Sequence, residues 1–291
     1  MAGQVALSVG MLSRRFPERY VAAWQIARAA LEIKREDRQL SYASKVPDSI
    51  QCEPGAALRV LGIGSGSGEV DSAMLKKVLQ RHKTVYNRVV EPSGEMLERY
   101  KTLVREDKSL GAVTFDWRQQ TAEEYFQTKE DTKFHLVHAI QVLYNVEDHH
   151  ATLRNMWEQV ESGGYMLVAM ESDHSDLGKL HYKLWDEFGQ GDRLKTSLRS
   201  SGDVKQWLDA RGISYVTWEN INVNFNVTEC FKEDSEAGKM LLDFLTLTPY
   251  VSSDTKIKSM VLDFIRCNSS LADGKVIFKA SSDVVVAFRR K

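Results

Sequence analysis

The stretch Val60-Leu-Gly-Ile-Gly-Ser-Gly-Ser-Gly68 decides the fold of this chain. Its apolar beginning belongs to residues 57–63, a run short enough for a buried strand, and apolar side chains then recur at helical spacing across residues 69–80. Glycines let the backbone approach a ligand closely, and the N-terminus of the following helix offers unpaired N–H groups to it. A strand, a glycine-rich loop and a helix in this order therefore favour a ligand-binding loop over a flexible turn.

The spacing of the glycines distinguishes this loop from two well-known nucleotide-binding loops. A dinucleotide-binding loop follows the pattern G-x-G-x-x-G, but here Glu69 stands where the third glycine after Gly64 and Gly66 would be. A P-loop ends in Gly-Lys-Ser or Gly-Lys-Thr, and no such tripeptide follows Gly68. The loop therefore argues against a dehydrogenase and against a P-loop protein.

Strands and helices alternate in the predicted secondary structure around this loop. The predicted strands are residues 57–63, 86–91, 113–117, 134–140 and 165–170, and the predicted helices between them are residues 69–80, 94–104 and 151–160. This alternation predicts an α/β fold with a doubly wound, mostly parallel sheet.

The segments outside this alternation are expected to shape the substrate side of the molecule, because ligands bind beyond the carboxyl ends of the strands. Residues 15–35 predict an N-terminal amphipathic helix. After Ser172 the sequence predicts a polar, helix-like stretch across residues 173–205, helices at residues 207–212 and 236–247, and a strand across residues 213–225. The last strand is predicted at residues 276–278 or at residues 284–288, with a hairpin of both as a further alternative. We therefore divide the chain into an N-terminal helical substrate cap (1–55), a ligand-binding core (56–172) and a substrate subdomain with the closing strands (173–291).

A single acidic residue ends the second predicted strand. Glu91 ends the apolar run of Val89-Val90 and precedes Pro92-Ser93. A carboxylate at this end of a strand faces the crevice beside the glycine loop and can accept both ribose hydroxyls of an adenosine ligand. This position favours a binding role over a solvated acid at the end of a strand.

Composition excludes several classes of protein. The 291 residues carry 39 basic and 40 acidic side chains, a net charge of −1 that argues against a nucleic-acid partner. No apolar stretch approaches the roughly 18 residues of a membrane-spanning helix, and Met1–Ser8 does not have the pattern of a secretory signal. The chain has three cysteines, Cys52, Cys230 and Cys267. Their odd number and wide spacing suit reduced thiols in the cytoplasm.

Four stretches together resemble histamine N-methyltransferase, in the same order and at nearly the same spacing from about Arg59 to Phe278. They are Val60-Leu-Gly-Ile-Gly-Ser-Gly-Ser-Gly-Glu69, Val89-Val-Glu-Pro-Ser93, Phe134-His-Leu-Val-His-Ala-Ile-Gln-Val-Leu-Tyr144 and Leu241-Leu-Asp-Phe-Leu-Thr246. The resemblance implies a Rossmann-like class I methyltransferase fold, with a seven-stranded, mostly parallel sheet and a smaller substrate-binding subdomain. It also implies S-adenosylmethionine as the cofactor and S-adenosylhomocysteine as its product. The residues implied to bind the cofactor are Gly64, Gly66, Gly68, Glu91, Met96, Thr121, Ala122 and Ile140.

The same resemblance implies a pocket for a small amine. Gln141 would point into this pocket, and Glu32 is the nearest match to the family's amine-binding Glu in the N-terminal helix, with a solvated helix residue as the alternative. The implied pocket walls are Tyr144, Trp185 and Phe244, although a single aromatic residue belongs to a core more often than to a pocket. Two positions depart from the family: Asn145 replaces an aromatic residue and Ala280 replaces an Asn that contacts substrate. Both departures put histamine itself in doubt as the substrate.

The expected chemistry needs little from the protein. The methyl group of S-adenosylmethionine is already activated by its sulfonium, so the protein aligns a nitrogen lone pair with it and excludes water. An imidazole with a pKa near ~6.5 is mostly neutral at pH 7, so Gln141 as an orienting amide and Glu32 as a partner for the ammonium suffice. The alternatives are methylation of another heteroaromatic or phenolic nucleophile, and a non-catalytic protein that binds the cofactor. We expect a cytoplasmic monomer. We also expect no metal, because no Cys or carboxylate cluster accompanies His149-His150.

Overall fold

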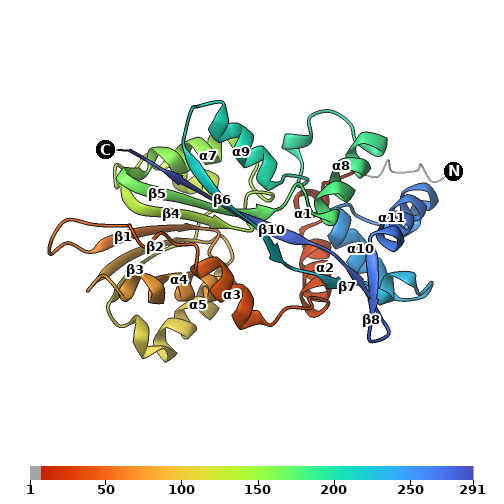
Figure 1. Ribbon diagram of the computed structural model, residues 1–291, viewed down its shortest axis with the longest axis horizontal. Helices are drawn as coiled ribbons and strands as arrows, with labels where there is room; N and C mark the ends of the chain where they lie inside the picture. The colour runs from red at the N-terminus through yellow and green to blue at the C-terminus, as the bar shows by residue number, and fades with distance from the viewer. Residues whose placement is uncertain (1–7, 291) are drawn as a thin grey trace. The chain divides into compact units, whose positions relative to one another are not determined.

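The computed structural model describes residues 8–290, which form two compact units (Figure 1). Within the described residues, the sheet unit comprises residues 35–170, 201–219 and 283–290. The helical unit comprises residues 8–34, 171–200 and 220–282. Each unit has a hydrophobic core of its own. The predicted lack of a secretory signal concerns a segment of which residues 1–7 lie outside the described part of the chain.

The sheet unit is organised around a seven-stranded sheet with the order β3-β2-β1-β4-β5-β10-β6. Its strands are β1 (Leu58–Ile63), β2 (Val85–Val90), β3 (Val113–Arg118), β4 (Phe134–Ile140), β5 (Val160–Glu171), β6 (Tyr215–Asn222) and β10 (Ser281–Phe288). The pairs β1–β2, β1–β4, β2–β3 and β4–β5 are parallel. The predicted seven-stranded, mostly parallel α/β fold is confirmed. Because β2 lies on one side of β1 and β4 on the other, β1 is the switch point where ligands bind in such sheets.

Helices cover this sheet: α3 (Arg35–Ala43), α4 (Glu69–Leu79), α5 (Gly94–Glu106), α6 (Ala122–Gln127), α7 (His149–Glu158) and α9 (Ser201–Asp209), together with a short 3-10 helix at Lys108–Leu110. Several of them begin at a side chain that accepts a hydrogen bond from the first turn. Asp148 Oδ1 accepts the N–H of Ala151 at 2.8 Å, and Ser93 Oγ accepts the N–H of Met96 at 3.3 Å. These caps fix where each helix starts relative to the strand before it.

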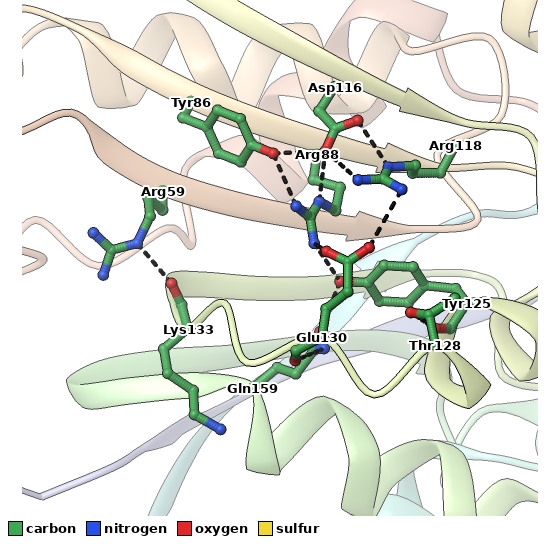
Figure 2. A network of polar contacts seen from close by, with 10 residues as sticks. All are labelled: Arg59, Tyr86, Arg88, Asp116, Arg118, Tyr125, Thr128, Glu130, Lys133 and Gln159. Carbon is green, nitrogen blue, oxygen red and sulfur yellow. Dashed lines mark hydrogen bonds and ion pairs between the residues drawn. The ribbon is translucent and has the colours of Figure 1, made fainter.

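A network of charged and hydroxyl side chains ties β2 and β3 to α6 (Figure 2). Arg88 alternates along β2 with residues of the opposite face, and its buried guanidinium donates through Nε to Asp116 Oδ2 at 2.8 Å. It also donates to the hydroxyls of Tyr86, at 3.0 Å, and Tyr125, at 3.2 Å, and it pairs with Glu130. The remaining members are Arg118, which pairs with both carboxylates, Gln159, which accepts from Tyr125, and Thr128. The network therefore fixes α6 and the segment after it against the sheet.

The helical unit contains α1 (Leu12–Arg15), α2 (Pro17–Ala29), α8 (Asp176–Phe188), α10 (Glu236–Thr246) and α11 (Thr255–Cys267), with 3-10 helices at Arg193–Lys195, Thr228–Phe231 and Val251–Ser253. Its antiparallel sheet has the order β7-β9-β8, formed by Phe225–Asn226, Lys275–Phe278 and Ser269–Ala272. Arg19 of α2 pairs with the buried Asp243 of α10 at 2.5 Å. Among the described residues, no helix is both long and apolar enough to cross a membrane.

The N-terminal helix is shorter than predicted, and this corrects the position of Glu32. The helix predicted over residues 15–35 ends at Ala29, and Leu31 forms a β-bridge with Phe225. The N–H of Glu32 donates to the carbonyl of Asn224 at 2.9 Å, and the N–H of Asn226 donates to that of Ala30 at 2.7 Å. These strand-like bonds replace the next helical turn, so Glu32 follows the helix and does not lie within it.

Both candidates for the last strand, residues 276–278 and residues 284–288, form strands, but the alternative that they pair as a hairpin is wrong. The first of these segments is β9, which lies between β7 and β8, and the second is part of β10, which lies between β5 and β6 in the other sheet. The hairpin partner of β9 is β8, with Ala272 opposite Lys275. Asp273 and Gly274 between them have φ of +49° and +73°, the left-handed conformations that a two-residue hairpin turn requires.

Candidate active site

The glycine loop and Glu91 meet at the carboxyl ends of two neighbouring strands. Ile63 at the end of β1 pairs with Val90 at the end of β2, so the loops that follow leave the same edge of the sheet. The N–H of Gly66 donates to Glu91 Oε2 at 2.8 Å, and the N–H of Ser93 donates to Oε1 at 2.9 Å. The structure therefore brings the glycine loop and Glu91 together.

The environment of Glu91 suits a carboxylate that binds polar groups. The side chain is 7% exposed, and burial raises the pKa of its carboxyl above the ordinary value, while the bonds from Ser93 and Gly66 oppose this shift. Each carboxylate oxygen has about two lone-pair sites. Since each accepts one backbone N–H, both retain capacity for a ligand hydroxyl. The arrangement can thus accept two neighbouring hydroxyls, as a ribose presents them.

The other residues predicted to contact the cofactor lie at the same edge of the sheet. Met96 lies in the first turn of α5, which follows β2, and Ile140 ends β4. Thr121 caps α6 after β3, where its Oγ1 accepts the N–H of Glu124 at 3.1 Å, and Ala122 begins that helix. The hydroxyl of Thr121 is therefore committed to the helix, which leaves its backbone and Ala122 as the parts that can face an adenine.

Gln141 follows β4 in an unusual backbone conformation. Its φ is +56°, a left-handed value that is uncommon outside glycine and asparagine and is often found at functional sites. Its N–H donates to the carbonyl of Ala169 at 2.9 Å, and its side-chain Nε2 donates to the hydroxyl of Tyr42 at 3.4 Å. Tyr144 and Asn145 follow on the same loop, where Tyr144 packs partly buried on the core and Asn145 is exposed.

The helical unit holds the remaining predicted pocket residues. Trp185 of α8 and Phe244 of α10 are partly buried against the same hydrophobic cluster, which includes the buried Ala280. Glu32 Oε1 pairs with Lys275 Nζ at 3.2 Å, with both side chains partly exposed. The structure thus gathers the apolar members around one core, and their role as pocket walls stays a prediction.

A buried pair of titratable groups beneath the glycine loop is missing from the sequence prediction. Asp71 lies in the first turn of α4, and its Oδ2 is 3.8 Å from Nε2 of His138 on β4. Burial raises the pKa of Asp71 and lowers that of His138. The sequence offered one signal for this pair, because Asp71 lies in the first turn of the predicted helix, on the face that α4 buries. Within residues 8–290 no group of three or more His, Cys, Asp or Glu side chains is placed to hold a metal ion.

Comparisons with known proteins agree with this geometry. Residues 18–217 match the family model of the methyltransferase domain. Histamine N-methyltransferases of Xenopus tropicalis and Danio rerio are each 34% identical to this chain, over 80% and 79% of it and 82% of each relative. The plantazolicin methyltransferase BpumL, solved in complex with S-adenosylhomocysteine, shares the fold with a TM-score of 0.52 at 9% identity, over 97% of this chain and 94% of that one.

The loop geometry and the comparisons lead to the same family. A glycine loop whose N–H groups meet an acid from the next strand suits an adenosine cofactor, and the relatives cover most of the chain. The dehydrogenase and P-loop alternatives fail on the spacing of the glycines. The chain is an S-adenosylmethionine-dependent methyltransferase and belongs to the histamine N-methyltransferase family.

Proposed function

We propose that the enzyme transfers the methyl group of S-adenosylmethionine to a nitrogen of a small amine or imidazole-type acceptor. The observation that carries this proposal is the order of three loops at one edge of the sheet. β1 lies between β2 and β4, so the glycine loop is flanked by Glu91 on one side and by Gln141 on the other. A cofactor held by the first two features would have an amide beside it that can orient an acceptor.

The proposed residue roles follow from the groups that each side chain offers. The loop at Gly64, Gly66 and Gly68 and the carboxylate of Glu91 would hold the cofactor, whose sulfonium supplies an activated methyl group. Gln141 would orient the acceptor nitrogen. No strong base is needed for an imidazole, since it is mostly neutral at pH 7 with a pKa near ~6.5. The further proposed cofactor contacts are Met96, Thr121, Ala122 and Ile140.

The other residues proposed to contact the acceptor belong to the helical unit. Trp185, Phe244 and Ala280 belong to one cluster, which supports a shared apolar wall. Glu32 pairs with Lys275 at the surface, and exposed ion pairs are worth only about 0–1 kcal/mol. An acceptor ammonium could therefore replace the lysine at small cost. We propose the functional division into a cap (1–55), a cofactor core (56–172) and a substrate subdomain (173–291).

The free thiols bear on the cellular setting of the enzyme. Cys52, Cys230 and Cys267 are free thiols, which suits a reducing compartment such as the cytoplasm. We propose that the enzyme acts there as a monomer on a small molecule, with no metal and no nucleic acid. Size-exclusion chromatography with light scattering checks the oligomeric state.

Histamine is expected to be a poorer acceptor than a close relative of it. Asn145 is exposed on the loop after Gln141, and Ala280 lacks the amide that the family uses to contact substrate. A lost hydrogen bond to a buried polar group weakens selectivity by about 1–3 kcal/mol, or roughly ten- to a hundredfold. The measurement is kcat/KM, read by mass spectrometry, for histamine and a panel of substituted imidazoles, indoles, pyridines and phenols.

Each outcome of this panel has a separate meaning. A clear lead for histamine would show that Asn145 and Ala280 are neutral replacements. Faster methylation of phenols would favour an oxygen acceptor in place of nitrogen. If no acceptor is methylated while S-adenosylmethionine still binds, the protein is a non-catalytic binder and the proposed function is wrong.

Glu91→Gln is expected to weaken binding of S-adenosylmethionine. The amide cannot accept the same four hydrogen bonds as the carboxylate, and charge-assisted contacts are worth about 1.5–3 kcal/mol, or roughly ten- to a hundredfold in Kd. Isothermal titration calorimetry gives the affinity, and Glu95→Gln in the exposed first turn of α5 is the control. An unchanged Kd in Glu91→Gln would remove this residue from the cofactor site.

A further inference from the structure

Helix α3, which the sequence prediction missed, brings a buried hydroxyl to the predicted acceptor site. Tyr42 lies near the end of α3 and is 2% exposed. Lys77 of α4 donates to the carbonyls of Ser44, at 2.8 Å, and Val46, at 2.7 Å, just beyond Tyr42. Because α4 begins at the glycine loop, these bonds fix Tyr42 relative to that loop.

The hydroxyl of Tyr42 meets the side-chain amide of Gln141. Gln141 Nε2 donates to Tyr42 OH at 3.4 Å, across 99 residues of sequence. The backbone of Gln141 is fixed by the bond from its N–H to Ala169 and by its left-handed conformation. The two ends of the amide differ, since the nitrogen donates and the oxygen accepts. With the nitrogen donating to Tyr42, the oxygen is the end of the amide that faces away from α3.

We propose that Tyr42 is a positioning residue that holds the Gln141 amide with its carbonyl oxygen directed to the acceptor. This inference rests on the proposed function. The carbonyl would accept the N–H of an imidazole ring and so leave the other ring nitrogen with its lone pair. That lone pair forms the new N–C bond as the S–C bond breaks, the electron pair of that bond stays on sulfur, and the ring proton leaves to solvent. Tyr42 would thereby select the ring nitrogen that is methylated.

A double-mutant cycle tests this role. The variants are Tyr42→Phe, Gln141→Ala and the double variant, assayed with the fastest acceptor of the panel described above at saturating S-adenosylmethionine. Tyr42→Phe is expected to lower kcat/KM by roughly three- to tenfold, the range of one hydrogen bond. Gln141→Ala is expected to lower it at least as much. In the double variant the loss should equal that of Gln141→Ala alone, because the hydroxyl has nothing left to position.

Two further measurements separate positioning from a merely structural role. The calorimetric affinity for S-adenosylmethionine should stay the same in Tyr42→Phe, and the fraction of product methylated at the second ring nitrogen should rise. Tyr165→Phe is the matched control, since its hydroxyl bonds Ser49 Oγ at 2.7 Å and takes no part in the proposed site. Its kcat/KM should stay at the wild-type value.

Several results would overturn the inference. They are an unchanged kcat/KM in Tyr42→Phe, an equal loss in Tyr165→Phe, additive losses in the double variant, or weaker cofactor binding in Tyr42→Phe. If Gln141→Ala has wild-type activity, Tyr42 cannot act through it, while the proposed methyltransferase function stands. If no acceptor of the panel is methylated, the proposed function and this inference both fail.

Discussion

Replacing Arg88 with methionine is expected to lower the free energy of unfolding by about 3 kcal/mol, the lower end of the range for removing one partner of a buried ion pair. Arg88 is 5% exposed, and its guanidinium bonds two carboxylates and two hydroxyls (Figure 2). Methionine restores much of the volume but none of the donors. The lower end applies because Asp116 and Glu130 keep some contact with water. Denaturant unfolding followed by tryptophan fluorescence measures the loss.

The control variant for this prediction removes an exposed ion pair. Arg99→Met removes an exposed pair with Glu95 and should change stability by no more than about 0.5 kcal/mol.

For Asp116, burial raises the pKa, but bonds from Arg118, Tyr86 and Arg88 outweigh burial and hold it below the ordinary value. Such a carboxyl contributes stability above its unfolded-state pKa, and this is lost as the pH falls through the folded-state pKa. The deficit of Arg88→Met should therefore shrink below about pH 4. A deficit that stays constant down to pH 3 would contradict this explanation.

The alternating core of the sheet unit could be predicted because its signals are local. The strand predicted at residues 134–140 matches β4 at both ends, and its side chains are buried almost throughout, as expected for a central parallel strand. The glycine loop and Glu91 were predicted to meet because loops after neighbouring parallel strands leave the same edge. The bond from Gly66 to Glu91 follows from that rule.

The missed elements have weak or misleading local patterns. In α3 the exposed Leu40 breaks the expected apolar face, and the buried Tyr42 gives too little signal for a helix. Asp273-Gly274 is a strong hairpin signal in the sequence, and it forms the turn between β8 and β9. β10 is buried along nearly its whole length, which suits an inner strand of the large sheet better than an exposed hairpin.

In the predicted site, too, the features that depend on local sequence could be predicted, and contacts between residues distant in sequence could not. Residues that directly follow strands, such as Glu91 and Gln141, could be placed from the sequence. The contact between Tyr42 and Gln141 could not, because nothing in either local sequence indicates a partner 99 residues away. The end of the N-terminal helix at Ala29 depends on strand-like bonds to residues 224–226, so the place of Glu32 was equally beyond local reasoning.

Gly68→Ala is expected to destabilise the enzyme by about 2–5 kcal/mol and to disrupt cofactor binding. The φ of Gly68 is +80°, which costs an L-residue about 1–2 kcal/mol. A Cβ there would lie 2.0 Å from Cδ2 of Tyr100. This ring is fully buried and packs edge-on against Phe115 and Trp117, with centroids 5.8 and 5.2 Å away, so it cannot yield. Overpacking of this kind adds about 1–3 kcal/mol.

Gly66→Ala separates the two causes within the same loop. Gly66 also has a positive φ, of +57°, but a Cβ at this position meets nothing within 4 Å. It should therefore lose only the roughly 1–2 kcal/mol of backbone strain. Equal losses in Gly66→Ala and Gly68→Ala, measured by denaturant unfolding, would show that contact with Tyr100 is unimportant. If the contact dominates, Gly68→Ala made in a Tyr100→Ala background should lose no more than Gly66→Ala does, because the ring that the new methyl group would strike has been removed.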